Sequence, residues 1–133
     1  MLELISRASL GCSFIVANYD LKAVHSSNVL ASANWYNQRR GPDATNWATQ
    51  DGWSFVHNLL SMTGTVTLQP FVNGSAVAIF NGEVYNYREL ALELTGNVDA
   101  FASDGYSLLP AYRRWGEDFV RRLDGEFAVV IVD

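Results

Sequence analysis

The amino-acid sequence predicts an α+β fold in which helices pack on antiparallel β-sheet. Short apolar runs typical of buried strands lie at residues 12–19, 75–80 and 126–133. Segments with helical spacing or with helix-ending residues separate these runs. The sequence contains no regular alternation of parallel βαβ units and no glycine-rich phosphate loop. We therefore expect layers of helix and antiparallel sheet rather than a nucleotide-binding fold.

The first half of the chain is predicted to form two strands and one helix. Residues 12–19 and residues 53–60 are short apolar segments that read as strands. An imperfect apolar stripe with polar residues between predicts a helix over residues 23–36. Residues 37–46 are expected to form a loop, because a Gly-Pro pair interrupts them.

The second half is predicted to begin with a hairpin and a capped helix. The pair Asn73-Gly74 favours a hairpin turn leading into a buried strand at residues 75–80. Asn86 is expected to cap a helix over residues 87–94, and Gly96 is expected to close it.

A second helix and a final strand complete this half. Ser103-Asp104 is expected to open a helix that runs towards Trp115-Gly116. Pro110 lies inside that helix, where it removes a hydrogen bond and should bend or shorten the first part. Residues 126–133 are the last predicted strand.

Composition indicates a folded protein and limits its partners. Of the 133 residues, 49% are hydrophobic and 17% are charged, which excludes a disordered chain. The net charge of −5 argues against a nucleic-acid-binding surface. One cysteine permits no internal disulfide and suits a reducing compartment, and no apolar run reaches the length of a membrane span. We therefore expect a cytoplasmic protein that binds neither nucleic acid nor membrane.

Two features have both a structural and a chemical interpretation when they are taken alone. Cys12, the only thiol, lies on an apolar strand, where a cysteine is more often inert filling than a nucleophile. Asn81-Gly82 fits a tight turn as well as a site in which an amide and a backbone N–H meet a ligand. The residue types by themselves leave both questions open.

Eight segments together resemble the class II glutamine amidotransferase domain, the N-terminal-nucleophile (Ntn) hydrolase half of asparagine synthetases. They follow the family's order at similar separations and cover nearly the whole chain. The segments are 11–15 (GCSFI), 40–43 (RGPD), 57–62 (HNLLSM), 69–70 (QP), 80–87 (FNGEVYNY), 103–104 (SD), 108–116 (LLPAYRRWG) and 123–133 (LDGEFAVVIVD). The resemblance implies a layered αββα sandwich of antiparallel sheets.

The resemblance also implies a reaction and a processing step. In the family a cysteine thiolate attacks the side-chain amide of glutamine, and the free α-amine of the same cysteine is the base. Cys12 is the matching residue, but residues 1–11 precede it. We therefore expect a leader at residues 1–11, self-cleavage of the Gly11–Cys12 bond, and an amidotransferase domain at residues 12–133.

Further site residues follow from the matching segments. Asn81 and Gly82 match the family's oxyanion hole, in which a side-chain amide and a backbone N–H stabilise the tetrahedral intermediate. Asp104 resembles the acid that holds the substrate ammonium group, and Glu83 is expected beside it. The remaining predicted substrate-binding residues are Arg40, which also fits a loop-anchoring role, Leu60 and Met62.

The sequence departs from the family pattern in two places. Relatives carry, two positions after the histidine of the 57–62 segment, an arginine that clamps the glutamine carboxylate. Leu59 occupies that position here, and leucine cannot form a bidentate pair with a carboxylate. Relatives also continue into further strands after the segment ending at Asp133, so we expect this domain to lack the family's last strands and to leave a sheet edge uncovered.

These observations support two classes of function. The first is an amide hydrolase acting on glutamine or a related amide, with Cys12 as nucleophile and a separate synthetase subunit as ammonia acceptor. The second is an inactive or substrate-altered amidotransferase-like module that binds a ligand or acts structurally. Neither reading requires a cofactor or a metal. The uncovered sheet edge favours a homo-oligomer or a partner subunit.

Overall fold

The computed structural model describes residues 11–18, 24–61 and 66–133, and within the first helix it describes side chains from residue 28 onward. The chain divides into two structural units, Met1–Leu68 and Gln69–Asp133. Most of the expected leader, the end of the 12–19 strand and the predicted site residue Met62 lie outside the described residues. No helix in the described ranges is both long and apolar enough to cross a membrane.

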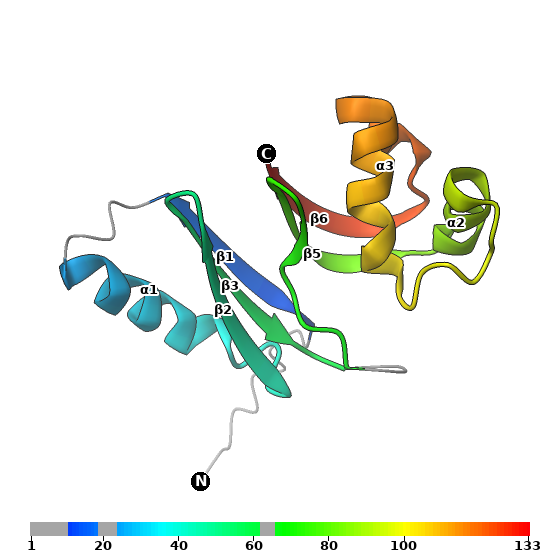
Figure 1. The fold of residues 1–133 in the computed structure, drawn as a ribbon. Coiled ribbons are helices and arrows are strands. Elements are labelled where there is room, and N and C mark those ends of the chain that lie inside the picture. Colours follow the sequence, from blue (N-terminus) through cyan, green and yellow to red (C-terminus); the bar gives the residue numbers. More distant parts are fainter. Residues whose placement is uncertain (1–10, 19–23, 62–65) are drawn as a thin grey trace, which may run out of the picture. The chain divides into compact units, whose positions relative to one another are not determined.

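The first unit is built on an antiparallel sheet with β3 at its centre. Strands β1 (Ser13–Asn18), β2 (Ala44–Gln50) and β3 (Trp53–Leu59) are ordered β1-β3-β2, and helix α1 (Val24–Asn37) lies along one face (Figure 1). These bounds confirm the two strands and the helix predicted for this half. In the sequence, α1 lies between β1 and β2, two strands that both pair with β3 and are not neighbours in the sheet.

Strand β2 was not expected, and the loop predicted over residues 37–46 is therefore too long. β2 begins at Ala44 and its residues alternate between more and less exposed positions, as in any strand with one covered face. The hydrophobicity pattern does not reveal this alternation, because most residues of β2 are Ala, Thr, Asn and Gln. A local signal exists in Asp51-Gly52, whose φ values of 50° and 81° form the tight turn between β2 and β3.

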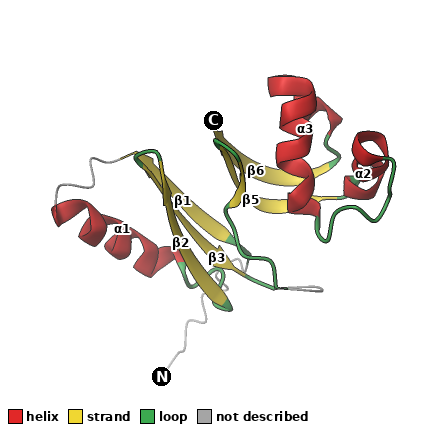
Figure 2. Ribbon diagram, viewed as in Figure 1, coloured by secondary structure: helices red, strands yellow, loops and turns green. Residues whose placement is uncertain are grey.

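The second unit contains a second antiparallel sheet with β5 at its centre. Strands β4 (Phe71–Asn73), β5 (Ala76–Val84) and β6 (Gly125–Val132) are ordered β4-β5-β6. Figure 2 shows β5 and β6 side by side. The predicted hairpin turn at Asn73-Gly74 and the predicted last strand are confirmed. In the described part of the chain, the secondary structure is thus mixed, with two antiparallel sheets and three α-helices.

The segment Asn81-Gly82-Glu83 lies within a strand, so Asn81-Gly82 does not form the tight turn that the pair alone would also have fitted. β5 runs through these residues to Val84, and they pair with Ala128, Phe127 and Glu126 of β6. Gly82 has a φ of 137°, a backbone conformation that only glycine adopts without strain. The Asn-Gly pair therefore marks a distortion inside a strand.

Helix α2 (Tyr87–Thr95) begins at the expected residue and is closed by the expected glycine, but the expected capping bond at its start is not made. Gly96 closes the helix in the left-handed conformation, with φ 78°, as predicted. Asn86 makes no side-chain capping bond. Its amide instead donates to the carbonyl of Arg122 at 2.8 Å and accepts from the N–H of Asp124 at 2.9 Å. Asn86 therefore ties the start of α2 to the segment entering β6.

The single helix predicted after Ser103 is divided into two parts. A short 3-10 turn, η1 (Asp104–Ser107), precedes helix α3 (Leu108–Trp115), and a second 3-10 segment, η2 (Gly116–Arg122), follows. Pro110 consequently lies in the first turn of α3, where a missing N–H leaves no helical hydrogen bond unmade. The predicted shortening of the first part is confirmed, and no kink is required.

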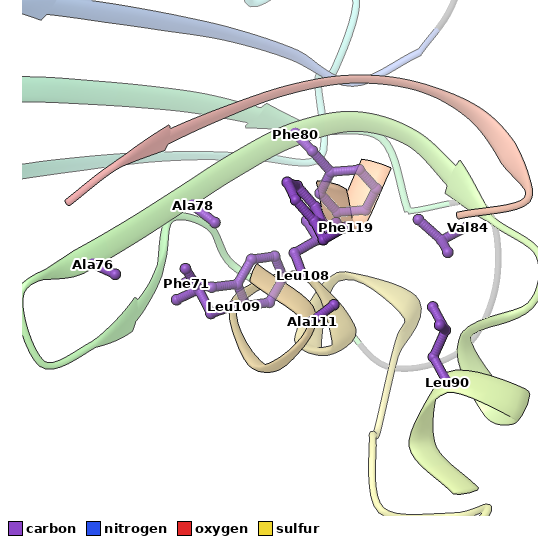
Figure 3. Packing of buried hydrophobic residues seen from close by; sticks show 10 residues of the cluster. All are labelled: Phe71, Ala76, Ala78, Phe80, Val84, Leu90, Leu108, Leu109, Ala111 and Phe119. Carbon is purple, nitrogen blue, oxygen red and sulfur yellow. The ribbon is translucent and has the colours of Figure 1, made fainter. Parts of the chain in front are cut away.

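The apolar core of the second unit lies between its sheet and its helices (Figure 3). Alternate residues of β5 and the buried side of α3 supply most of it, and Leu108 and Ala111 are fully buried. Full burial of a leucine or phenylalanine stabilises a fold by about 2 kcal/mol. The cluster consists of Phe71, Ala76, Ala78, Phe80, Val84, Leu90, Leu108, Leu109, Ala111 and Phe119.

Replacing Gly125 with alanine should strongly destabilise this unit. A Cβ at position 125 would lie 2.1 Å from the backbone oxygen of Glu83, so β5 and β6 would have to separate. We expect a loss of about 3 kcal/mol in the free energy of unfolding, measured by urea denaturation.

Gly96→Ala is the matched control for that substitution. Among the described residues no heavy atom lies within 4 Å of a Cβ built at Gly96, whose φ is 78°. Only the left-handed conformation then carries a cost, about 1–2 kcal/mol. Equal losses in the two variants would contradict the close approach of β5 and β6.

Candidate active site

Cys12 lies just before β1 and its thiol contacts the end of β3. Its Sγ accepts a hydrogen bond from the N–H of Leu60 at 3.4 Å and donates to the carbonyl oxygen of Leu60 at 3.7 Å. The side chain is partly buried and is a free thiol. The structure therefore brings together two of the predicted site residues, Cys12 and Leu60, by joining β1 to β3.

The chain on both sides of Cys12 is fixed by hydrogen bonds. The N–H of Gly11 donates to the carbonyl oxygen of Arg40 at 3.1 Å. On the other side, the hydroxyl of Ser13 donates to the carbonyl oxygen of Asn37, the last residue of α1, at 3.0 Å. Arg40 thus contributes a backbone carbonyl that holds the residue before Cys12, in keeping with the loop-anchoring role that the sequence also allowed.

The loop after α1 closes over the end of β3. A Cβ at Gly41 would lie 2.3 Å from the backbone oxygen of Asn58, so this approach requires glycine. The N–H of Asp43 donates to the carbonyl of Leu59 at 3.0 Å, and the Asp43 carboxylate accepts from the N–H of Ser61 at 2.7 Å. The Arg-Gly-Pro-Asp segment therefore holds the strand end on which Leu60 lies.

A buried polar network lies behind Cys12, and the sequence reading did not identify it. Asn58 is fully buried in β3 and lies opposite both Ser13 of β1 and Thr45 of β2. Its Nδ2 donates to the hydroxyl of Ser13 at 3.0 Å and to Oδ1 of Asn34 at 2.7 Å. Its Oδ1 accepts from Nδ2 of Asn34 at 3.3 Å and from the hydroxyl of Thr45 at 2.9 Å.

In the second unit, Asn81 and Gly82 occupy adjacent positions of β5. A Cβ at Gly82 would lie 2.0 Å from the backbone oxygen of Glu126, so β6 also approaches this residue closely. Strand alternation places Asn81 on the face of the sheet opposite to the core residue Phe80. The side-chain amide of Asn81 therefore projects away from the helices of this unit and is partly exposed.

Asp104 is attached to the end of β5 through backbone hydrogen bonds. One carboxylate oxygen accepts from the N–H of Val84 at 2.9 Å, and the other accepts from the N–H of Gly105 at 2.9 Å. Burial raises the pKa of the neighbouring Glu83 carboxyl, and the negative charge of Asp104 raises it further. The structure therefore brings the predicted pair Glu83 and Asp104 together at one end of the sheet.

His57 and Leu59 lie on the face of β3 opposite to Asn58, as strand alternation requires. His57 is fully buried, and neither ring nitrogen has a hydrogen-bond partner among the described residues. Burial lowers the pKa of His57 to about 4. Leu59 is only 8% exposed, so the residue at the family's arginine position is part of the core.

The predicted site residues thus form two groups. Cys12, Leu60 and Arg40 belong to the first unit, whereas Asn81, Gly82, Glu83 and Asp104 belong to the second. Met62 lies outside the described residues. No group of three or more His, Cys, Asp or Glu side chains with the arrangement of a metal site occurs in the described ranges.

Comparison with known proteins assigns the chain to a family. The sequence model of the glutamine amidotransferase domain matches residues 12–133, and the chain belongs to this family. The match begins at Cys12 itself.

The similar curated proteins are named as glutamine-hydrolyzing asparagine synthetases. One from Mycobacterium tuberculosis strain H37Rv, assigned to that class, is 36% identical over 122 residues, which is 80% of this chain and 19% of the relative. Asparagine synthetase 2 of Oryza sativa subsp. japonica is 35% identical over 99 residues, 72% of this chain and 17% of the relative. Asparagine synthetase 2 of Bacillus subtilis is 35% identical over 97 residues, which is 71% of this chain and 13% of the relative. The chain spans less than a fifth of the length of these relatives.

The burial of His57 predicts a stability that falls on acidification. The folded pKa of about 4 lies below the ordinary value of 6.5, so the unfolded chain takes up a proton first as the pH falls. The contribution of neutral His57 is present above about pH 7 and is lost progressively between pH 6.5 and 4. The loss should reach about 3 kcal/mol, obtained as the difference between wild type and His57→Leu in urea denaturation across this range.

The other histidine provides the control for this measurement. His25→Gln should keep the wild-type dependence of stability on pH, because His57 remains. If His57→Leu loses stability between pH 7 and 4 as steeply as wild type does, the buried neutral imidazole is not the cause.

Proposed function

We propose that this domain hydrolyses the amide of glutamine or of a related compound, with Cys12 as the nucleophile. The Cys12 thiolate forms a bond to the amide carbon, and the carbon–nitrogen bond then breaks to release ammonia. Water hydrolyses the resulting thioester, which gives the carboxylate product and restores the thiol. The family match that begins at Cys12 is the observation that carries this proposal.

Activation would require removal of residues 1–11. Cleavage of the Gly11–Cys12 bond gives Cys12 a free α-amine with a pKa of about 8, which can accept the thiol proton near neutral pH and later protonate the leaving ammonia. It would also remove the hydrogen bond between Gly11 and Arg40, which in the uncleaved chain fixes the residue before the nucleophile.

We assign the oxyanion donors to the side-chain amide of Asn81 and the backbone N–H of Gly82. Donors of this kind contribute about 3 kcal/mol each to lowering the barrier. The position of Asn81 supports this assignment because its side-chain amide projects away from the helices of its unit and is partly exposed. For the fold we propose the layered αββα sandwich that the family resemblance implies.

The substrate ammonium group is assigned to Asp104 and Glu83. Each Asp104 oxygen already accepts one backbone N–H, and a carboxylate retains further lone pairs for a charged ligand. Leu60, Met62 and Arg40 are proposed as further substrate-binding residues, as the family resemblance implies. We propose no cofactor for this chemistry.

The ammonia acceptor is proposed to be a synthetase. The relatives are named asparagine synthetases, and their matched part is less than a fifth of their length. We propose a synthetase as partner, a homo-oligomeric assembly, and a cytoplasmic location suited to a free thiol.

Intact-mass measurements over time should reveal the processing step. We expect wild-type protein to lose the mass of residues 1–11, and Cys12→Ala to keep it, because the thiol is the attacking group. Ammonia release from glutamine should accompany the cleaved form. A wild-type mass that never changes would rule out self-cleavage. Cleaved protein that releases no ammonia from glutamine would rule out glutamine as the substrate.

A second candidate function is favoured by Leu59. This position carries the carboxylate-clamping arginine in relatives, but here it is a leucine that is 8% exposed and belongs to the core. A buried apolar side chain cannot hold a carboxylate. The domain would then act on an amide without a free α-carboxylate, or bind such a ligand without turnover.

Substituting Leu59 with arginine should distinguish these candidates. If the fold still accommodates a clamp, Leu59→Arg should lower KM for glutamine by about tenfold or more, since a charge-assisted contact contributes about 2 kcal/mol. Leu59→Met, which keeps size without charge, is the control and should leave KM unchanged. A wild-type KM already below that of Leu59→Arg would mean that another residue holds the carboxylate.

A further inference from the structure

The buried network around Asn58 joins four elements at one point behind Cys12. Asn58 on β3 has its two N–H bonds and both lone pairs of its oxygen engaged by Ser13, Asn34 and Thr45. These partners come from β1, α1 and β2. Asn58 therefore fixes the relative positions of all four elements in the first unit.

Two of these contacts lead directly to the nucleophile. Ser13 follows Cys12 in the chain, and its hydroxyl is held both by Asn58 and by the carbonyl of Asn37. Leu60, which contacts the Cys12 sulfur, lies two residues after Asn58. A single side chain thus anchors both segments between which the thiol lies.

The hydrogen bonds of Asn58 and Ser13 matter more for the position of Cys12 if the leader is removed. Cys12 then becomes the first residue of the chain, and chain ends are disordered unless they are tied down. The Gly11 hydrogen bond to Arg40 would be lost with the leader, whereas the bonds of Ser13 would remain. After the thiol of Cys12 itself, Ser13 would be the first side chain that holds the new terminus in place.

We infer that Asn58, acting through Ser13, is a positioning residue for Cys12. The pair holds the thiol against Leu60 and gives the terminal residue one orientation toward a bound amide. This inference rests on the proposed function for its catalytic consequence, but the restraint on Cys12 itself does not depend on that function.

Thiol alkylation tests the restraint without assuming any activity. Cys12 is the only cysteine, so the rate of iodoacetamide labelling reports on it alone. At a pH where a free thiol is ionised, Ser13→Ala should label about threefold faster or more, because the released side chain is more accessible. The double variant Asn34→Leu/Asn58→Leu should behave in the same way, and Ser13→Ala serves by itself if the double variant does not fold.

Thr45→Val is the matched control. It removes a hydrogen bond to the same Asn58 oxygen, but on β2, away from Cys12. It should therefore lose comparable stability and keep the wild-type labelling rate. Wild-type labelling in Ser13→Ala, or equal acceleration in Thr45→Val, would overturn the inference.

Amide hydrolysis by the same variants separates this inference from the proposed function. In cleaved protein, Ser13→Ala should lower kcat by about tenfold with KM within about twofold, because a displaced nucleophile reacts slowly without binding less substrate. Unchanged kcat in an active enzyme would refute the positioning role alone. Absence of hydrolysis in wild type, with the labelling pattern intact, would refute the proposed function alone.

Discussion

The first unit depends on one buried carboxamide whose hydrogen-bonding capacity is fully used. Asn58 is fully buried on the central strand of the first sheet. A buried amide without partners destabilises a fold, but a satisfied one permits only a single arrangement of its neighbours. The hydrogen bonds of Asn58 therefore permit fewer alternative registers of the three strands, and fewer positions of α1, than apolar packing alone would permit.

The two units differ in the interactions that accompany their apolar packing. The second unit relies on a cluster of apolar side chains between β5 and its helices, together with glycines that let β5 and β6 approach closely. The first unit buries the apolar side chains of Leu30, Phe55, Val56 and Leu59, and adds to them the Asn58 network and the backbone contacts of the loop after α1. The residues assigned to nucleophilic attack lie on the first unit, and those assigned to charge stabilisation lie on the second.

The sequence predicted elements whose signals are local and apolar. β1, β3, β6 and α1 were found from apolar runs and spacing, and the glycine that ends α2 was found from its residue type. β2 was missed because most of its residues are small or polar, and Asn81-Gly82-Glu83 was placed outside the strand because Asn-Gly favours turns. Asn86 was assigned a capping role because its long-range partners, Arg122 and Asp124, cannot be inferred from spacing. The Asn58 network could not be predicted for the same reason. Its four residues are spread over 46 positions of the sequence and lie in polar segments.

The close approach of Glu126 to Gly82 has a consequence for how related sequences are interpreted. A residue with any side chain at position 82 would collide with the opposite strand, so folding alone suffices to retain glycine there. An amidotransferase-like chain that had abandoned chemistry altogether would still carry it. The presence of this glycine therefore does not indicate that a related chain is active. The neighbouring Asn81 is more informative, because its partly exposed amide is not required by packing. A related chain that has lost activity could therefore carry another residue at position 81.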